Sequence, residues 1–295
     1  MLENDTKNQH FVTQAEQRLN ASNPDADDKN KRIYSFKLVD RENYGLALEN
    51  PNGNRISKNL SASDLFSFDV AGDSDRRHNF EALFQKYEGP VATHTRNLLD
   101  KLKANNNDIK TEVIDLFAAK LLNFVRNPLS VVKILNTFPG LAAHDPTNPE
   151  LLKMYRRIAN GKKPHQARRC AELGISDVQY LEWLRILFML LMPLEDGRPN
   201  FFDQIIKQLF ENGDNYLAVW VCEYDHESCL LSDRGYSQPI PDGPHMAFSF
   251  NLCRNAFISY IFADPRTLLD GKAHPEFLDK VLADRKSFPE KANRR

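Results

Sequence analysis

The sequence has almost no net charge and no long apolar run. Its 295 residues carry 39 Lys and Arg against 40 Asp and Glu, which gives a formal net charge of −1. A near-neutral chain has no overall field that would draw it to nucleic acid or to a membrane, so any such binding must come from a local patch. The strongest apolar run, 184–194, is shorter than the roughly 20 residues of a membrane-spanning helix. We interpret it as a buried helix.

Cysteine is scarce, and its spacing argues against a structural zinc site. The four cysteines are Cys170, Cys222, Cys229 and Cys253, and no two form a Cys-x-x-Cys pair. Three of them lie in segments that we predict to be strands, which favours buried, reduced thiols. The polar start MLENDTKNQH carries no apolar signal segment. We therefore expect a cytoplasmic protein that does not enter a membrane.

Familiar nucleotide and metal motifs are also missing. The chain has no P-loop, no G-x-G-x-x-G and no H-E-x-x-H sequence. No single motif therefore predicts the chemistry of this protein, and its function has to be inferred from scattered residues and from the expected fold.

Apolar periodicity predicts a helical middle region. Apolar residues three and four apart favour helices over 75–88, 91–103, from 108 or 111 to 127, 129–137, 176–192 and 201–212. The helix that ends at 127 is apolar on most sides, with Lys120, Asn123 and Arg126 as polar exceptions. A helix that is apolar nearly all round belongs in the interior. Ser176 and Gln179 have the spacing of a capping box.

Runs typical of strands lie near the two ends of the chain. We predict antiparallel strands over 217–224, 229–232, 245–252 and 256–262, because short connections favour antiparallel pairing. The first two would form a strand pair that ends near Asp233. Further strands are expected over 32–38 and 44–50. The predicted fold is α+β, with the helical middle packed on an antiparallel sheet built mainly from the C-terminal third plus an N-terminal strand. We expect one domain over 1–295, with a helix near 275–285 in the tail 263–295.

Four short segments resemble a known family. Family members open with a His-Tyr/Phe-Val-Pro segment, carry a Glu after a helix, then have a helix that ends in Arg-x-Pro, and finally a Ser-Asp-Asn-Pro-like turn. The corresponding segments here are Gln9–Val12, Phe84–Pro90, Phe117–Ala119 through Arg126–Pro128, and Leu231–Arg234. In this order they resemble the prokaryotic domain of unknown function 4238 (DUF4238) family over about residues 9–262.

The chain departs from that family pattern at three places. Thr13 stands where the family usually has Pro, Lys120 or Asn123 falls near a position often held by Gln, and Arg234-Gly235 replaces Asn-Pro. The resemblance implies a prokaryotic setting, often phage defence or a mobile element. It implies no particular activity.

Four ionisable residues at the ends of apolar segments form a candidate catalytic site: His10, Glu88, Arg126 and Asp233. A buried charge must be paired or must coordinate something. Two carboxylates and an imidazole suit a hard divalent cation, and an arginine suits a phosphate. Our first hypothesis is a metal-assisted phosphodiester hydrolase, a nuclease-like defence effector. Glu88 and Asp233 would hold Mg²⁺ or Mn²⁺, His10 would act as a ligand or general base, and Arg126 would orient phosphate.

The same residues also fit a structural role. Arg126 would pair with Glu88 or Asp233, and His10 would hydrogen-bond a backbone carbonyl. Our second hypothesis is therefore a non-catalytic interaction or sensor protein. Both hypotheses are compatible with the sequence.

A basic segment offers a binding surface for either hypothesis. Residues 153–169 contain seven Lys and Arg and no acid. Such a segment is either a solvated connection or a surface that contacts the phosphate backbone of nucleic acid. The nucleic-acid contacts that we predict are Arg156, Arg157, Lys162, Lys163, Arg168 and Arg169.

Overall fold

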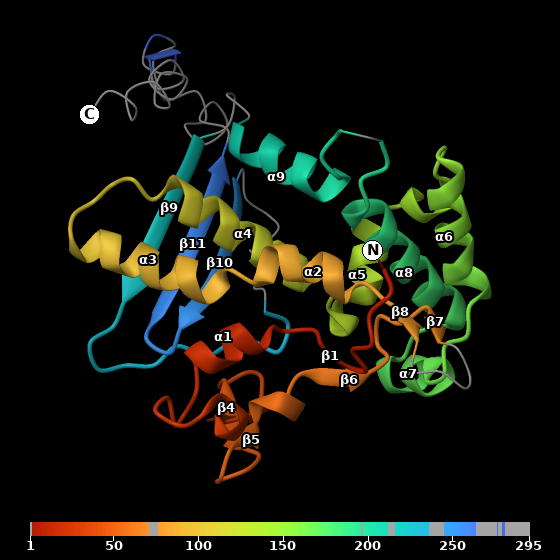
Figure 1. The fold of residues 1–295 in the computed structure, drawn as a ribbon. Coiled ribbons are helices and arrows are strands. Elements are labelled where there is room, and N and C mark those ends of the chain that lie inside the picture. The colour runs from red at the N-terminus through yellow and green to blue at the C-terminus, as the bar shows by residue number, and fades with distance from the viewer. Residues whose placement is uncertain are drawn as a thin grey trace.

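The computed structural model describes residues 2–70, 76–195, 197–211, 216–235 and 245–263, with Glu276, Asp279 and Lys280 as single residues. Helices occupy the middle of the chain and an antiparallel sheet follows them, so the predicted α+β class is confirmed. Figure 1 shows the helices α3 and α4 lying across this sheet, with most other helices to one side. The expected helix over 275–285 and the tail lie largely outside the described residues. Within the described ranges, no helix has the length and apolarity needed to cross a membrane.

The N-terminal region consists of short strands around one short helix. Its elements are β1 (Asn8–His10), α1 (Gln14–Leu19), β2 (Arg32–Ile33), β3 (Phe36–Asp40), β4 (Gly45–Leu48), β5 (Asn54–Arg55), β6 (Ser61–Ser63), β7 (Asp69–Val70) and β8 (Arg77–His78). They pair locally and antiparallel as β1–β6, β2–β5, β3–β4 and β7–β8. The Thr13 hydroxyl accepts a hydrogen bond from the Ala15 N–H and so caps α1.

The middle region is helical, and local signals set several of its boundaries. The helices are α2 (Glu81–Glu88), α3 (Val91–Lys103), α4 (Lys110–Val125), α5 (Val131–Thr137), α6 (Pro149–Asn160), α7 (Gln166–Leu173), α8 (Asp177–Leu191) and α9 (Phe201–Glu211). The predicted capping box is confirmed at the start of α8, where Ser176 and Gln179 bond reciprocally. Asn148 caps α6, which has Pro149 at its first position.

The C-terminal sheet has the order β10–β11–β9 and packs on α4. Its strands are β9 (Tyr216–Glu223), β10 (His245–Cys253) and β11 (Ala256–Ala263), all antiparallel. The Phe117 ring of α4 lies with its centroid 4.9–6.0 Å from the ring centroids of Phe250, Tyr260 and other aromatics of the sheet. The Tyr260 hydroxyl donates to the Val113 carbonyl at 2.8 Å. These contacts fix α4 against the sheet and confirm that it is an interior helix.

The other end of α4 is held by α8. Trp183, which is fully buried, donates its indole N–H to the Val125 carbonyl at 2.8 Å. On the same helix, the Tyr180 hydroxyl donates to the Leu65 carbonyl at 2.6 Å. Since these bonds satisfy buried polar groups, they fix the C-terminal end of α4 relative to the N-terminal region. Arg126 lies at this end.

The N-terminal strand does not join the C-terminal sheet in the described part of the chain, so that part of the fold prediction is wrong. Residues 32–33 pair with 54–55, and 36–40 pair with 45–48. The physical reason is proximity along the chain, because sequential strands pair with each other more readily than with distant ones.

Two further boundaries also differ from the prediction. Residues 229–232 are not a strand, and β9 pairs instead with β11 along its whole length, from Glu223–Ala256 to Tyr216–Ala263. The Cys229 N–H donates to the Arg254 carbonyl at 2.6 Å, so this segment lies against the β10–β11 turn. The helix predicted over 75–88 begins only at Glu81, because 77–78 pair with 69–70 as strands.

Candidate functional site

Three of the four predicted site residues meet where β1, α2 and α4 end. His10 closes β1, Glu88 closes α2, and Arg126 caps the C-terminus of α4. Arg126 Nη2 lies 2.8 Å from Glu88 Oε2, and the two side chains are 1% and 14% exposed. The guanidinium also lies over the Phe84 ring, 5.1 Å from its centroid. Arg126 is therefore paired inside the protein.

The ion pair is one end of a buried chain of polar contacts. Arg126 Nη2 also donates to Asn123 Oδ1 at 3.0 Å, and Asn123 Nδ2 donates to the Glu16 carboxylate of α1. The other Glu16 oxygen accepts from Lys120 Nζ, and both of these side chains are 1% exposed. Residues three apart on a helix lie on one face, so the polar face of α4 is matched by carboxylates from α1 and α2. We call Glu16, Glu88, Lys120, Asn123 and Arg126 the polar network.

His10 lies beside the network and bonds to the backbone. Its Nε2 donates to the Ile56 carbonyl at 3.2 Å. Burial lowers the pKa of His10 below its usual value, the bond to Ile56 opposes this shift, and Arg126 adds to it. The imidazole is therefore neutral near pH 7, and its Nε2–H is fixed as a hydrogen-bond donor to a carbonyl.

Asp233 reaches the same region only through its backbone. Its side chain is exposed, and its Oδ1 accepts from the neighbouring Ser232 hydroxyl at 3.4 Å. Its backbone carbonyl accepts from Asn127 Nδ2 at 3.1 Å. Gly235 closes the turn at φ +58, and a Cβ there would lie 3.0 Å from Asn123 Nδ2. The turn thus packs tightly on the end of α4, while the Asp233 carboxylate faces solvent.

A further carboxyl, which the sequence analysis did not single out, borders the network. Glu81 and Glu88 are seven residues apart on α2 and so share one face. Burial raises the pKa of Glu81 to about 7, Arg126 opposes the shift, and Glu88 adds to it. Glu81 Oε1 and Arg126 Nε are both buried without a hydrogen-bond partner among the described residues. An unpaired buried polar atom calls for a structural or functional explanation.

Sequence spacing could have identified the two missed acids. Glu16 lies three residues before Leu19 in α1, and Glu81 lies three residues before the buried Phe84 in α2. Each acid thus occupies an apolar position of an amphipathic helix. A charged residue at such a position is a signal of burial, and burial of a charge requires a partner.

The two predicted metal ligands do not fit a divalent cation as they are placed. Glu88 is already bound to Arg126, and the Asp233 carboxylate is exposed, with only its backbone carbonyl in contact with Asn127. Mg²⁺ requires nearly octahedral oxygen coordination with free carboxylates. In the described ranges, no group of three or more His, Cys, Asp and Glu side chains could hold a metal ion. We therefore assign no step to a metal, and metal dependence is left to experiment.

The basic segment is folded as two helices, α6 and α7, with a short connection. The exposed residues Lys153, Arg156 and Arg157 lie three and four apart on α6 and so share one face. Arg157 Nη1 donates to His78 Nε2 at 2.8 Å, and Arg156 lies 3.9 Å from Asp145. Lys162 follows the helix and is exposed. These four cations, which we call the α6 surface, are open to solvent.

The other three cations that were predicted to bind nucleic acid are engaged within the protein. Arg168 and Arg169 both pair with Glu172, at 3.5 and 2.7 Å. Lys163 Nζ donates to the Gly161 carbonyl, and burial lowers the pKa of its ammonium. Of the six predicted contacts, Arg156, Arg157 and Lys162 therefore belong to the α6 surface, because an arginine in a close ion pair adds little to the field that a phosphate meets. The contact of Arg156 with Asp145, at 3.9 Å, is longer than the pairs that Arg168 and Arg169 make with Glu172.

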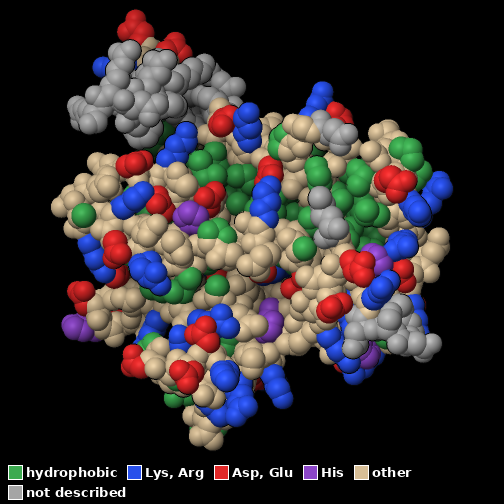
Figure 2. Space-filling model, in the orientation of Figure 1, with side chains coloured by type: hydrophobic (Ala, Val, Ile, Leu, Met, Phe, Trp, Pro, Cys, Tyr) green, Lys and Arg blue, Asp and Glu red, His purple; other side chains and the backbone are tan. Residues whose placement is uncertain are grey.

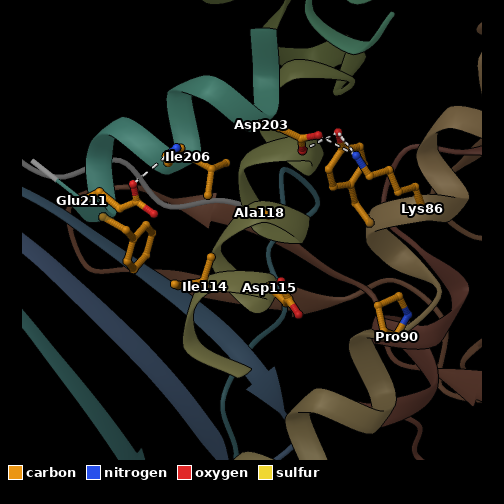
Figure 3. A pocket seen from close by; sticks show the side chains of 11 residues that line it. Lys86, Pro90, Ile114, Asp115, Ala118, Asp203, Ile206 and Glu211 are labelled. Carbon is orange, nitrogen blue, oxygen red and sulfur yellow. Dashed lines mark hydrogen bonds and ion pairs between the residues drawn. The ribbon is translucent and has the colours of Figure 1, made fainter. Parts of the chain in front are cut away.

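A separate pocket of about 330 Å³ lies between α2, α4 and α9 (Figure 3). Ile114, Ala118 and Ile206 line its apolar part. On its rim, Asp203 accepts from Lys86 at 2.5 Å and from the Tyr87 hydroxyl at 2.9 Å. The volume is at the low end of the range for small-molecule sites. The Asp203 carboxylate is therefore already bonded within the protein and is not free to orient a ligand.

Comparisons with known proteins leave the chain unassigned. No family model matches it, and no curated protein or solved structure matches it either. The resemblance to the domain of unknown function 4238 family therefore stays a prediction, and the function has to be argued from the geometry alone.

Proposed function

We propose that the chain is a non-catalytic interaction protein, in which the polar network fixes the fold and the α6 surface binds an anionic polymer such as nucleic acid. The supporting observation is that the network satisfies its own charges: Arg126 pairs with Glu88, and Lys120 pairs with Glu16. His10 in turn donates to a backbone carbonyl. A buried pair whose partners are both present is a structural unit that is disrupted when either partner is lost.

The α6 surface supplies the proposed contact. Its cations lie on one exposed helix face and on the residue that follows the helix, so they can approach neighbouring phosphates together. Phosphate contacts give affinity without sequence preference, and they make binding depend steeply on salt. Because the whole chain has almost no net charge, such binding has to come from a local patch, and the α6 surface is such a patch.

The test is the salt dependence of binding to double-stranded DNA and RNA of mixed sequence. For duplex DNA, each phosphate contact contributes about −0.9 to the slope of log K against log salt. Replacing Lys153, Arg156, Arg157 and Lys162 by Ala should therefore reduce the magnitude of this negative slope by up to about 3.6. The matched control is Arg168→Ala, which removes an exposed but ion-paired cation and should leave the slope nearly unchanged. Absence of binding at low salt would reject this proposal.

A phosphodiester hydrolase with a nuclease-like defence role is a second candidate, and one observation favours it. Glu81, whose pKa is raised by burial to about 7, could donate a proton at neutral pH. The unpaired Nε of Arg126 is a donor for a phosphate oxygen, but this side chain is 1% exposed, so the site would have to open before a phosphate could reach it. Incubating the protein with DNA and RNA, with Mg²⁺, with Mn²⁺ and with a chelator, tests this candidate and its metal dependence together. Cleavage that Glu81→Gln abolishes without loss of stability would replace the interaction proposal.

A further inference from the structure

An uncovered apolar hairpin lies outside the helical body. β3 and β4 pair Phe36 with Leu48 and Leu38 with Leu46. Residues two apart along a strand point to the same side of the ribbon, so these four form one apolar side, which we call the hairpin face. Each of them is 44–47% exposed. Among the described residues, no third strand pairs with this hairpin.

Apolar residues around the hairpin enlarge this surface. Tyr34, Val39 and Tyr44 are 48%, 62% and 81% exposed, so seven of the sixteen exposed large hydrophobic residues of the described chain lie within 34–48. At about 200 Å² per aromatic and about 100 Å² per aliphatic side chain, they expose roughly 550 Å². Val39 lies on the opposite side of the ribbon from Leu46, because its Cγ2 is 3.7 Å from the position of a Cβ at Gly45, so this apolar area is spread over both sides of the hairpin. Exposed apolar area of this extent often marks an interaction site.

We propose that the hairpin is an interface between two copies of this chain, with one hairpin face packed on the other around a two-fold axis. The hairpin face itself supplies roughly 230 Å² of apolar surface per copy, so the contact reaches the approximately 1,000 Å² expected of a specific interface only when Tyr34, Tyr44 and the polar side chains beside the face are also covered. A two-fold contact requires a surface that is complementary to itself. Two cross-strand apolar pairs on one side of a hairpin meet that requirement, because each pair can pack on the equivalent pair of the second copy.

The charge around the hairpin favours a second copy over a polyanion or a lipid surface. Residues 32–55 hold Arg32, Lys37, Arg41 and Arg55 against Asp40, Glu42 and Glu49. Figure 2 shows charged side chains of both signs on the lower part of the molecule, where this region lies. Nucleic acid and anionic membranes are bound by surfaces of mainly positive charge. A surface with both signs can instead place its cations against the acids of its copy. This interface is independent of the α6 surface.

The test is the mass of the intact chain in solution, measured by sedimentation and light scattering over a wide range of protein concentration. The wild type should approach twice 33.9 kDa as concentration rises. Leu38→Glu with Leu46→Glu should stay at the monomer mass throughout, because it places charge in the proposed contact. The control Val178→Glu changes an apolar side chain that is 71% exposed at the start of α8, and it should dimerise like the wild type.

Each other outcome would overturn the proposal. A wild type that stays monomeric at every concentration excludes the interface, and a dimer that survives the double substitution locates it elsewhere. Masses above the dimer would mean open edge-to-edge strand pairing in place of a closed contact. If the wild-type monomer sediments with anionic vesicles and the double variant does not, the hairpin binds a lipid surface and not a second copy. Circular dichroism verifies folding, and the milder Leu46→Ser variant replaces the double variant if that variant unfolds.

Discussion

The polar network buries charged side chains, whereas the hairpin exposes apolar side chains. Both depart from the usual distribution, in which charged residues lie at the surface and apolar residues lie in the core. In the network, Glu16, Lys120 and Arg126 are almost completely buried. In the hairpin, Phe36 and Leu46 remain nearly half exposed. The buried charges of the network are paired with partners from α1, α2 and α4, so the network can have a purely structural function. The hairpin has nothing in the described chain to cover its face, so its apolar residues point to an external partner.

The difference also separates what holds the fold from what contacts other molecules. Breaking one member of a buried charge pair leaves the other member without a partner in a low-dielectric interior. Removing an exposed apolar side chain affects the isolated monomer little, because that side chain is already hydrated. Stability measurements should therefore respond strongly to the network and weakly to the hairpin.

The largest effect is expected from Arg126→Leu. The change leaves Glu88 and Asn123 without their charged partner, and we expect a loss of about 3 kcal/mol in the free energy of unfolding, measured by urea denaturation. The estimate is at the lower end of the range for buried pairs because the Glu88 side chain is 14% exposed.

Two variants serve as controls for this substitution. Adding Glu88→Leu to Arg126→Leu removes both charges and should restore part of the lost stability, because no uncompensated charge remains. Arg156→Leu changes an arginine that is 65% exposed and should stay within about 0.5 kcal/mol of the wild type. A loss for Arg126→Leu no larger than for Arg156→Leu would contradict the structural role of the network.

A somewhat smaller effect is expected from pH through Glu81. Its pKa is raised from 4.5 to about 7 in the folded protein, so the folded state holds a proton that the unfolded state releases. The stability from this group is full below pH 4.5 and is lost as the pH rises through about 7. The difference between 4.5 and about 7 corresponds to about 3 to 4 kcal/mol in full, of which about 2 to 3 kcal/mol should be lost between about pH 5 and pH 8. Glu81→Gln removes the titration and should be the more stable protein near pH 8.

The contribution of His10 must be separated from this measurement. Its pKa is lowered in the folded protein, so its contribution to stability is lost as the pH falls, whereas that of Glu81 is lost as the pH rises. Stability that depends on neutral His10 is lost as the pH falls below 6.5. The difference between the wild type and Glu81→Gln at each pH isolates the glutamate. Arg126 and Glu88 are the charged groups that act on Glu81, and both are present in the two proteins. If the two stability curves run parallel between about pH 5 and pH 8, Glu81 does not titrate in this range.

The sequence predicts the long amphipathic elements well and the tertiary pairing poorly. The helix over 91–103 and the interior helix that carries Lys120 agree with α3 and α4, because apolar periodicity is a local property. Within the candidate site, the structural hypothesis predicts that Arg126 pairs with Glu88 or Asp233, and Glu88 is the partner in the structure. Glu16 was missed, because its partner Lys120 lies more than a hundred residues away along the chain and only the fold brings them together. Pairing of short strands likewise depends on competition among partners, which periodicity does not describe.

The smallest effect is expected from Leu46→Ala in the hairpin, compared with the same change at Leu187 in α8. Leu187 is completely buried, and its truncation should reduce the free energy of unfolding by about 2–5 kcal/mol through lost contacts and a cavity. Leu46 is 47% exposed and packs mainly on Leu38 across the hairpin, so its truncation should reduce stability by less than about 1 kcal/mol at low protein concentration. As protein concentration rises, the gap between the wild type and Leu46→Ala should widen, because only the wild type gains stability from self-association. A gap that is large at low concentration and independent of concentration would mean that the hairpin stabilises the monomer itself, and the contrast between the two regions would not hold.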